Sequence, residues 1–277
     1  MGAIIWLASY PKSGNTWMRA FLHNLLTNAK NPVSIGSLNQ FCLGEDLAEY
    51  YNHIDPRPLS QLSAMEVLEL RPKVHELLTK ASPDSVFVKT HNFLGVVEGV
   101  SLINLNCTAG AIYVLRNPLD VTISYSHHFG VDLDEAIQQL GCSGTGTTTT
   151  DMNARQHFSS WSTHVESWTQ DAFPALHVVR YEDMTDNPLE TFAGVAKFLG
   201  LAPPLERLRR AISHSSFRQL QSQERKKGFA ERSQHSRFFR SGQSGQWREI
   251  LSEDQIKRIV SDHRAQMERF GYVPEGY

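Results

Sequence analysis

The chain has 277 residues, 40% of them hydrophobic, and a formal net charge of −2 at pH 7. This length and apolar content suit one large α/β domain over residues 1–277 with a sizeable core. The near-neutral charge argues against a general nucleic-acid or polyanion binder, although it leaves room for locally basic patches.

The three cysteines, Cys42, Cys107 and Cys142, lie far apart and form no C-x-x-C pair. That pattern favours free thiols in a reducing compartment over a disulfide framework or a zinc site. The first residues lack the basic segment and the long apolar run of a signal peptide. No stretch is long and apolar enough to span a membrane, so we expect a cytoplasmic protein.

A polar loop at residues 8–17 connects two apolar patterns. Residues 3–7 form a short apolar run that predicts a buried strand, and residues 18–26 carry apolar side chains at helical spacing. We expect Asn15 or Thr16 to cap that helix. The unpaired N–H groups of a helix N-terminus suit a phosphate, so the layout predicts an anion site.

Four residues of this loop strengthen the prediction. Lys12 adds a positive charge, Ser13 and Thr16 add hydroxyl donors, and Gly14 supplies backbone freedom. The loop is not a Walker A motif, which needs lysine directly after the second glycine, because Lys12 precedes Gly14 by two positions. Taken alone, the loop is explained equally well by an ordinary turn with a solvated lysine.

Turn-forming residues dominate positions 28–58, where we expect an irregular loop. Its aromatic residues Phe41, Tyr50 and Tyr51 either pack on the domain or form part of an acceptor-binding wall.

Residues 63–80 have helical spacing, and Ser63 with Glu66 forms a candidate capping box. Pro72 predicts a kink or a junction between two helices within this range.

A second strand, predicted at residues 86–88, is followed directly by Lys89, Thr90 and His91. A cation and an imidazole at the carboxyl end of a strand lie where open α/β sheets bind their ligands. Most loop histidines are ordinary surface residues, so this segment alone does not establish catalysis.

A third strand is predicted at residues 111–115, and Arg116 follows it. Asn117 and Pro118 suit the N-cap and first turn of a helix, which makes Arg116 part of a second anion site. Ser124 lies about two helical turns further on, so it shares that site only if the helix skirts the ligand. Otherwise Arg116 pairs with a surface carboxylate and Ser124 is a helix-face hydroxyl.

The later patterns predict helices at 132–140, 154–169, 188–199, 205–212 and 252–270, and a strand at 175–179. The Gly/Thr-rich residues 141–150 predict a mobile surface loop, either a lid near an acceptor or a plain insertion. Residues 221–240 are the basic part of the chain and suit either a solvated loop or a clamp over an anionic cofactor.

Five segments together resemble the sulfotransferases that use 3′-phosphoadenosine 5′-phosphosulfate (PAPS). Tyr-Pro-Lys-Ser-Gly-Asn-Thr-Trp at 10–17 is similar to the 5′-phosphosulfate loop of that family, and Val-Lys-Thr-His at 88–91 to its base segment. Arg-Asn-Pro-Leu-Asp-Val-Thr-Ile-Ser-Tyr at 116–125 resembles the 3′-phosphate signature. Ser-Ser-Phe at 215–217 and the glycine segment at 239–247 match two further family segments.

The resemblance implies a P-loop-NTPase-like fold: one α/β domain with a central parallel sheet flanked by helices. It implies sulfuryl transfer from PAPS to an acceptor hydroxyl or amine, leaving 3′-phosphoadenosine 5′-phosphate (PAP) and using no metal. The catalytic residues that it assigns are His91 as base, Lys12, Lys89 and Ser124. The cofactor-binding residues that it assigns are Lys12, Ser13, Gly14, Asn15, Thr16, Trp17, Arg116, Ser124, Tyr181, Ser215, Phe217, Arg240, Ser241 and Gly242. Ser241 stands where the family has lysine, so only backbone N–H groups of Ser241 and Gly242 serve a phosphate there.

Two other classes stay open. A P-loop kinase or NTPase-like phosphotransferase would need Mg²⁺ and a Walker A loop, and the latter is missing. A nucleotide-binding module without catalysis would bind PAP without turnover.

The expected partner is a small-molecule, natural-product or lipid acceptor, which no transferable motif identifies. Phe41, Tyr50, Tyr51 and Phe129 hint at an apolar or aromatic acceptor, although core packing explains them as well.

Overall fold

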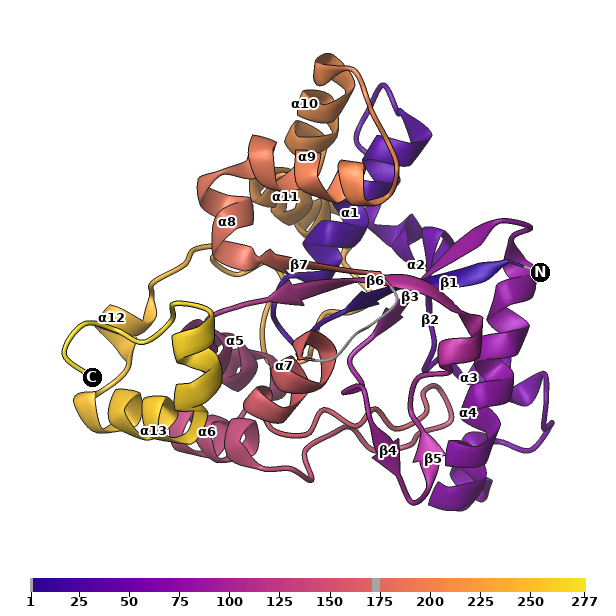
Figure 1. The fold of residues 1–277 in the computed structure, drawn as a ribbon, viewed down its shortest axis with the longest axis horizontal. Coiled ribbons are helices and arrows are strands. Elements are labelled where there is room, and N and C mark those ends of the chain that lie inside the picture. The colour runs from indigo at the N-terminus through magenta and orange to yellow at the C-terminus, as the bar shows by residue number, and fades with distance from the viewer. Residues whose placement is uncertain (1, 171–174) are drawn as a thin grey trace.

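The computed structural model describes residues 2–170 and 175–277. Its centre is a five-stranded sheet in the order β2-β3-β1-β6-β7, in which every pairing is parallel. Helices cover both faces of this sheet, as Figure 1 shows. The α/β class and the central parallel sheet expected from the sequence are therefore confirmed.

The strands of the sheet are β1 (Ala3–Ala8), β2 (Cys42–Gly44), β3 (Ser85–Thr90), β6 (Thr108–Leu115) and β7 (Leu176–Arg180). A separate antiparallel pair consists of β4 (Val96–Val97) and β5 (Val100–Ser101). The helices in the first half of the chain are α1 (Asn15–Thr27), α2 (Leu38–Phe41), α3 (Ala48–Asn52), α4 (Ala64–Leu78), α5 (Pro118–Phe129) and α6 (Leu133–Gly141). Those in the second half are α7 (Trp161–Thr169), α8 (Tyr181–Asp186), α9 (Pro188–Phe198), α10 (Leu205–His214), α11 (Phe217–Lys227), α12 (Trp247–Ile250) and α13 (Glu253–Arg269).

Side chains of the central strands alternate between two cores. In β1, Trp6 and Ala8 face the core built with α4, α5, α7 and α13, whereas Leu7 faces the core built with α1, α9 and α10. All three side chains are fully buried. Because helices cover both faces, the strand is apolar along almost its whole length, which is typical of a parallel sheet.

The loops after β1, β3 and β6 emerge at the same edge of the sheet because these strands are parallel. The chain leaves β1 into α1 on one face and leaves β6 into α5 on the other face (Figure 1). The two connections diverge and leave a crevice between neighbouring strands, which is where open α/β sheets bind ligands. The fold thus directs the predicted loops to one place.

Residues 28–58 are more regular than expected. They contain β2, which pairs with β3 at the edge of the sheet, and the short helices α2 and α3. A strand of three residues has too few positions to show a period in sequence, so only its pairing with β3 defines it.

The helix α4 is continuous, so the expected junction at Pro72 is wrong. Its buried face, which includes Val67, Val74 and Leu78, packs into the core. This packing stabilises the helix on both sides of Pro72. The capping box of Ser63 and Glu66 is confirmed.

Residues 145–158, here called the polar ribbon, refine one prediction and correct another. Its two halves pair: the backbone amide of Thr147 donates to the carbonyl of Gln156 at 2.9 Å, and that of Thr150 to the carbonyl of Asn153 at 2.8 Å. Residues 141–150 lie at the surface as predicted, but this pairing holds part of their backbone. The second half is extended, because this pairing uses its backbone, and α7 begins only at Trp161 rather than at residue 154.

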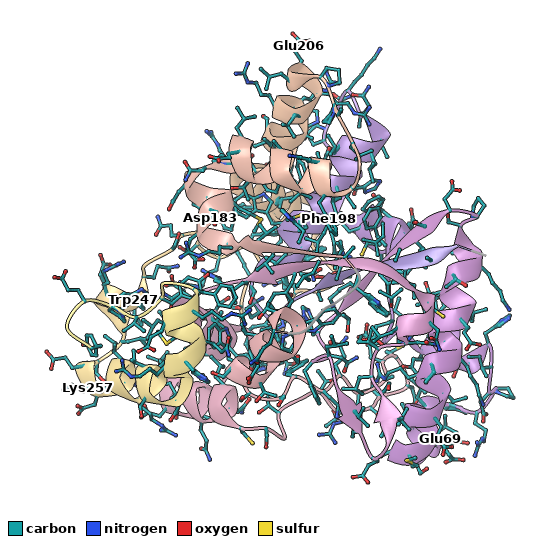
Figure 2. The ribbon with its side chains drawn as sticks, viewed as in Figure 1. Glu69, Asp183, Phe198, Glu206, Trp247 and Lys257 are labelled. Carbon is teal, nitrogen blue, oxygen red and sulfur yellow. The ribbon has the colours of Figure 1, made fainter. Side chains whose placement is uncertain are left out.

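The outer helices expose charged side chains. Figure 2 shows Glu69 on α4, Glu206 on α10 and Lys257 on α13 at the outside of the molecule. Within residues 2–170 and 175–277, no helix combines the length and apolarity needed to cross a bilayer.

Candidate active site

The loop between β1 and α1 owes its shape to Gly14. This residue is the N-cap of α1 with φ 109°, and no side chain caps the helix, so the capping expected from Asn15 or Thr16 is wrong. Asn15 Nδ2 instead donates to the carbonyl of Leu7 at 2.8 Å. A Cβ on Gly14 would lie 2.7 Å from the ring of Tyr181, so both the backbone angle and the packing require glycine.

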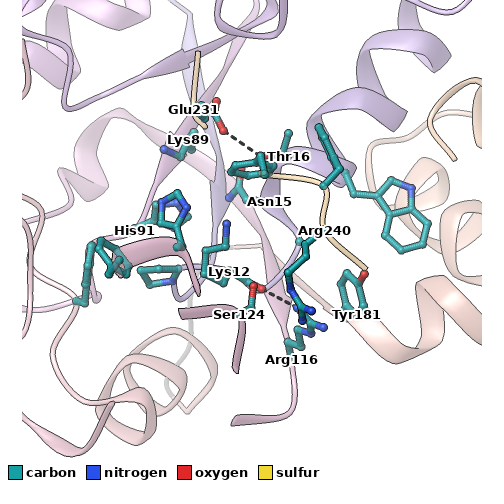
Figure 3. A pocket seen from close by; sticks show the side chains of 18 of the residues that line it. Lys12, Asn15, Thr16, Lys89, His91, Arg116, Ser124, Tyr181, Glu231 and Arg240 are labelled. Atoms are coloured by element: carbon teal, nitrogen blue, oxygen red, sulfur yellow. Dashed lines mark hydrogen bonds between the residues drawn. The ribbon is translucent and has the colours of Figure 1, made fainter. Parts of the chain in front are cut away.

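A buried carboxylate contacts the start of α1. The hydroxyl of Thr16 donates to Oε2 of Glu231 at 3.0 Å (Figure 3). Nη1 of the fully buried Arg19 lies 2.5 Å from Oε1 of the same carboxylate. Burial opposes ionisation of Glu231, yet the charges of Arg19 and Lys89 hold its pKa at about 2. The structure therefore places an anion of the chain itself at this helix N-terminus.

Lys12 points into the crevice beneath an aromatic ring. Its ammonium Nζ lies 4.0 Å from the ring centroid of Phe238, a cation–π contact. Burial lowers the pKa of Lys12 to about 7; repulsion from Arg116 and Lys89 adds to this, while Glu231 opposes it. The amine is therefore poised to gain a proton when an anion approaches.

Arg116 ties the loop after β1 to the C-terminal part of the chain. Its Nη1 donates to the carbonyl of Lys12 at 3.1 Å and its Nη2 to the carbonyl of Gln243 at 3.0 Å. The guanidinium lies 4.2 Å from the centroid of the Tyr181 ring. Its buried Nε finds no partner among the described residues, so one donor remains for a ligand.

Two contacts hold the C-terminal glycine segment against the site. Asp120 accepts the amides of Gly245 at 2.6 Å and Trp247 at 3.3 Å, which fastens the segment to the start of α5. Gly242 has φ 68°, and a Cβ there would lie 2.3 Å from the ring of Phe217. The glycine thus permits the ring to lie directly against the backbone.

His91 has a defined tautomer. Its Nδ1 lies 2.7 Å from the carbonyl oxygen of Ser9, and because a carbonyl only accepts, Nδ1 carries the hydrogen and Nε2 keeps its lone pair. Burial lowers the pKa of His91 well below 6.5, and repulsion from Lys89 adds to the shift. The ring is therefore neutral near pH 7 and has a free basic nitrogen.

A second histidine fixes the backbone of His91. His164 Nε2 lies 3.2 Å from the carbonyl of His91 and therefore donates to it, while its Nδ1 lies 2.8 Å from the hydroxyl of Tyr113. His164 is fully buried, and burial lowers its pKa to about 3. It acts as a neutral hydrogen-bonding link.

Behind this segment, the buried Glu45 collects four donors. Its carboxylate accepts hydrogen bonds from the side chains of four residues: Arg71 at 2.5 Å, His75 at 3.2 Å, Thr90 at 2.6 Å and Asn92 through Nδ2. Although burial opposes ionisation, Arg71 and His75 hold the pKa of Glu45 at about 2. Thr90 and Asn92 flank His91, so the cluster anchors the strand end that carries the imidazole.

A cavity of about 460 Å³ brings Lys12, His91, Arg116 and Glu231 together in its wall (Figure 3). Its wall contains most of the residues predicted from the sequence: Lys12, Gly14, Asn15, Thr16, Trp17, Lys89, His91, Arg116, Ser124, Tyr181, Phe217, Arg240, Ser241 and Gly242. Ser13 and Ser215 do not line it. Ser13 is buried with no partner for its hydroxyl among the described residues, and Ser215 donates to the carbonyl of Ala211 at 2.9 Å.

Several lining residues carry no recognisable signal in the sequence. Glu231 and Phe238 lie within residues 221–240, where the sequence predicts a basic loop or clamp. Gln156 and Phe158 lie within residues 154–169, where the sequence predicts a helix. Their common signal is a polar or aromatic side chain in an irregular stretch, which is too frequent in proteins to single them out.

Among the aromatic residues expected near an acceptor, only Phe129 lines this cavity in the described parts of the chain. Phe41 stacks between His23 and Phe87, and Tyr51 is buried in the core. Likewise, no group of three or more His, Cys, Asp or Glu within residues 2–170 and 175–277 is placed to hold a metal ion.

The fold and the cavity define an α/β protein with cations gathered around the loops after β1, β3 and β6. The family model described as "Sulfotransferase domain" matches residues 4–271. The chain therefore belongs to the sulfotransferase domain family, as the resemblance of its motifs predicts.

Similar proteins agree with this assignment. Sulfotransferase 1A1 of Canis lupus familiaris is 24% identical over 96% of this chain and 83% of its own length. Sulfotransferase 1B1 of the same species is 27% identical over 94% and 82%.

Solved structures share the fold. A retinol dehydratase in complex with retinol and PAP has a TM-score of 0.66 at 21% identity, covering 96% of this chain and 81% of that chain. Mouse sulfotransferase SULT7A1 complexed with PAP has a TM-score of 0.63 at 18% identity, covering 96% and 84%.

Proposed function

We propose that this enzyme transfers a sulfuryl group from PAPS to an acceptor hydroxyl or amine, with His91 as the general base. The observation that supports it most is the convergence of His91, Lys12, Lys89 and Arg116 on one cavity. Figure 3 shows His91 and Tyr181 on opposite sides of Lys12, and all three line the same cavity. PAP in two structures of the same fold agrees with this choice of donor.

The residues present fit a doubly phosphorylated nucleotide. One anionic end suits the loop at Gly14 with Lys12, and the other suits Arg116, whose Nε is a buried donor without a partner among the described residues. The rings of Tyr181 and Phe217, which line the same cavity, suit a base between them. Ser13 adds a buried hydroxyl that also lacks a described partner.

The reaction requires one proton transfer and one displacement at sulfur. The neutral Nε2 of His91 accepts the proton of the acceptor as the new S–O bond forms. The bond from sulfur to the bridging oxygen of the donor breaks, and its electron pair leaves on the phosphate of PAP. Lys12 offsets charge on that oxygen, and Lys89 offsets charge on the transferring group. We place Ser124 beside Arg116, where its hydroxyl donates a further hydrogen bond to a phosphate of PAPS.

Three measurements test the proposal. PAP should bind in titration calorimetry, and labelled PAPS should transfer its label to a panel of phenols, alcohols, glycosides and amines. His91→Ala should abolish transfer and leave PAP affinity within about twofold, since the imidazole contacts the acceptor rather than the phosphates. Absence of PAP binding would refute the donor, and transfer by His91→Ala at the wild-type rate would refute the base.

A further inference from the structure

The acceptor end of the cavity lies beside His91. The amide of His157 donates to Oδ1 of Asn92 at 2.6 Å, and the amide of Phe93 donates to the carbonyl of His157 at 2.9 Å. The polar ribbon therefore runs directly along the segment that carries the base. The ring of Phe158 meets the imidazole edge-on, with centroids 6.3 Å apart. Whatever accepts the sulfuryl group must rest against this ribbon.

That wall is mostly polar and uncharged. Its hydrogen-bonding side chains are Asp46, Thr147, Thr148, Thr150, Asn153 and Gln156. The apolar contribution comes from Phe129 and Phe158. Ligand pockets are usually lined mainly by apolar side chains, so a wall with six hydrogen-bonding side chains suits a ligand that carries several polar groups.

Several of these groups are uncommitted. Gln156 is 3% exposed, yet its side-chain amide makes no hydrogen bond with any residue that the structure describes. Oγ1 of Thr147 accepts the amide of Gln156 at 2.9 Å, and Oγ1 of Thr150 accepts the amide of Asn153 at 3.1 Å. Since each hydroxyl uses its oxygen as acceptor there, its own hydrogen remains free to donate.

The ribbon is also held in place. The amide of Ala154 donates to the carbonyl of Asp46 at 2.7 Å, and Nδ2 of Asn153 donates to Oδ2 of Asp46 at 3.0 Å. The other carboxylate oxygen, Oδ1, has no described hydrogen-bond donor. The wall therefore presents a fixed set of donors and acceptors. Only Gln156 among them is buried, and a buried polar group costs free energy unless a ligand or a water satisfies it.

From this wall, and resting on the proposed sulfuryl transfer, we infer that the natural acceptor is a polyhydroxylated molecule of the glycoside class rather than a simple phenol. A sugar ring has one apolar C–H face, which suits Phe129 and Phe158, and several hydroxyls, which suit the polar ribbon. A phenol offers a single hydroxyl, which His91 engages, and leaves Gln156 and the threonines unpaired. A site built for hydrogen bonds discriminates strongly against an analogue that lacks them.

A matched pair of acceptors tests this inference. 4-Nitrophenol and its glucoside share the aryl group, and only the glucoside offers sugar hydroxyls. With labelled PAPS, we expect kcat/KM for the glucoside, or for another aryl glycoside in a panel of hexose epimers, to exceed that for the phenol by about tenfold or more.

Variants of the ribbon separate acceptor recognition from folding. Gln156→Leu and Thr148→Val should each lower kcat/KM for the preferred glycoside by about tenfold, the value of one or two hydrogen bonds, with PAP affinity unchanged. Thr149→Val is the matched control, because Thr149 does not line the cavity and only accepts the amide of Arg155 at 3.3 Å. It should stay within about twofold of the wild type.

The outcomes are distinguishable. The inference would be overturned if the enzyme preferred phenols or amines, or if the variants lost phenol and glycoside activity equally. It would also be overturned if the enzyme bound PAP but sulfated no glycoside. None of these results would contradict the proposed donor site. Failure to bind PAP at all would instead overturn the proposed function.

Discussion

The buried amine of Lys12 couples donor binding to proton uptake. Its pKa of about 7 in the free enzyme results from burial among other cations. A phosphate beside the amine favours the charged form, so the bound enzyme holds the proton well above pH 7. At pH 8 about nine-tenths of the free enzyme lacks this proton, and PAP binding should therefore take up about 0.9 proton per site.

The same linkage sets the change in affinity. Between pH 7 and pH 8 the dissociation constant of PAP should rise about fivefold, close to 1 kcal/mol. Both phosphates of PAP are already largely dianionic in this range, so they contribute little to the change. Titration calorimetry at pH 8 in buffers of different ionisation enthalpy measures the uptake directly.

Lys12→Met is the control, because it keeps the length of the side chain and removes the titrating group. The variant should bind PAP more weakly, without the dependence on pH or on buffer. A wild-type enthalpy that is the same in every buffer at pH 8 would show that Lys12 is already protonated in the free enzyme. Burial would then not lower the pKa of Lys12 to about 7.

Three further predictions concern single side chains. At saturating PAPS, where the bound donor keeps Lys12 protonated, kcat/KM for the acceptor should be flat from pH 6.5 upward to about pH 8 and fall only at lower pH, because burial keeps the pKa of His91 below 6.5; an acidic limb centred at or above 6.5 would contradict this. Glu45→Gln should destabilise the fold by about 3–5 kcal/mol, or about 5–9 °C in Tm, because it leaves Arg71 buried without a counter-ion and turns an NH₂ group toward donors. In the same melting assay Arg57→Ala, which breaks a solvent-screened pair with Asp55, should lower Tm far less than Glu45→Gln does, and equal losses would refute the distinction. Arg116→Ala should weaken PAP binding by about 1.5–3 kcal/mol, and an unchanged calorimetric titration would remove Arg116 from the site.

The loops that we propose for the donor could be placed from the sequence because their signals are local. A glycine and a lysine directly after a buried strand define the first loop, and Asn117 with Pro118 defines the start of α5. The structure confirms Asn117 as the cap, with its side chain accepting the amide of Leu119 at 3.0 Å. Such motifs determine the local backbone by themselves. Because each follows a strand of the parallel sheet, the strand order then places them at one edge of that sheet.

The acceptor half could not be predicted because its order is not local. The residues 141–150 are small and polar, and nothing in their sequence reveals that Thr147 pairs with Gln156. The same pairing draws residues 154–160 out of the helical pattern that their apolar spacing suggests. Glu231 was hidden for a similar reason, since its partner Arg19 lies more than two hundred positions away in the chain.

The contact of Thr16 with Glu231 has a consequence for how the cavity fills. A hydroxyl has a single hydrogen, so Thr16 cannot donate to the carboxylate and to an incoming anion at the same time. When no anion is bound, the carboxylate of Glu231 supplies the negative charge at this loop. If the proposed nucleotide binds Thr16, Thr16 must release Glu231, and loading the nucleotide exchanges one anion for another at this loop.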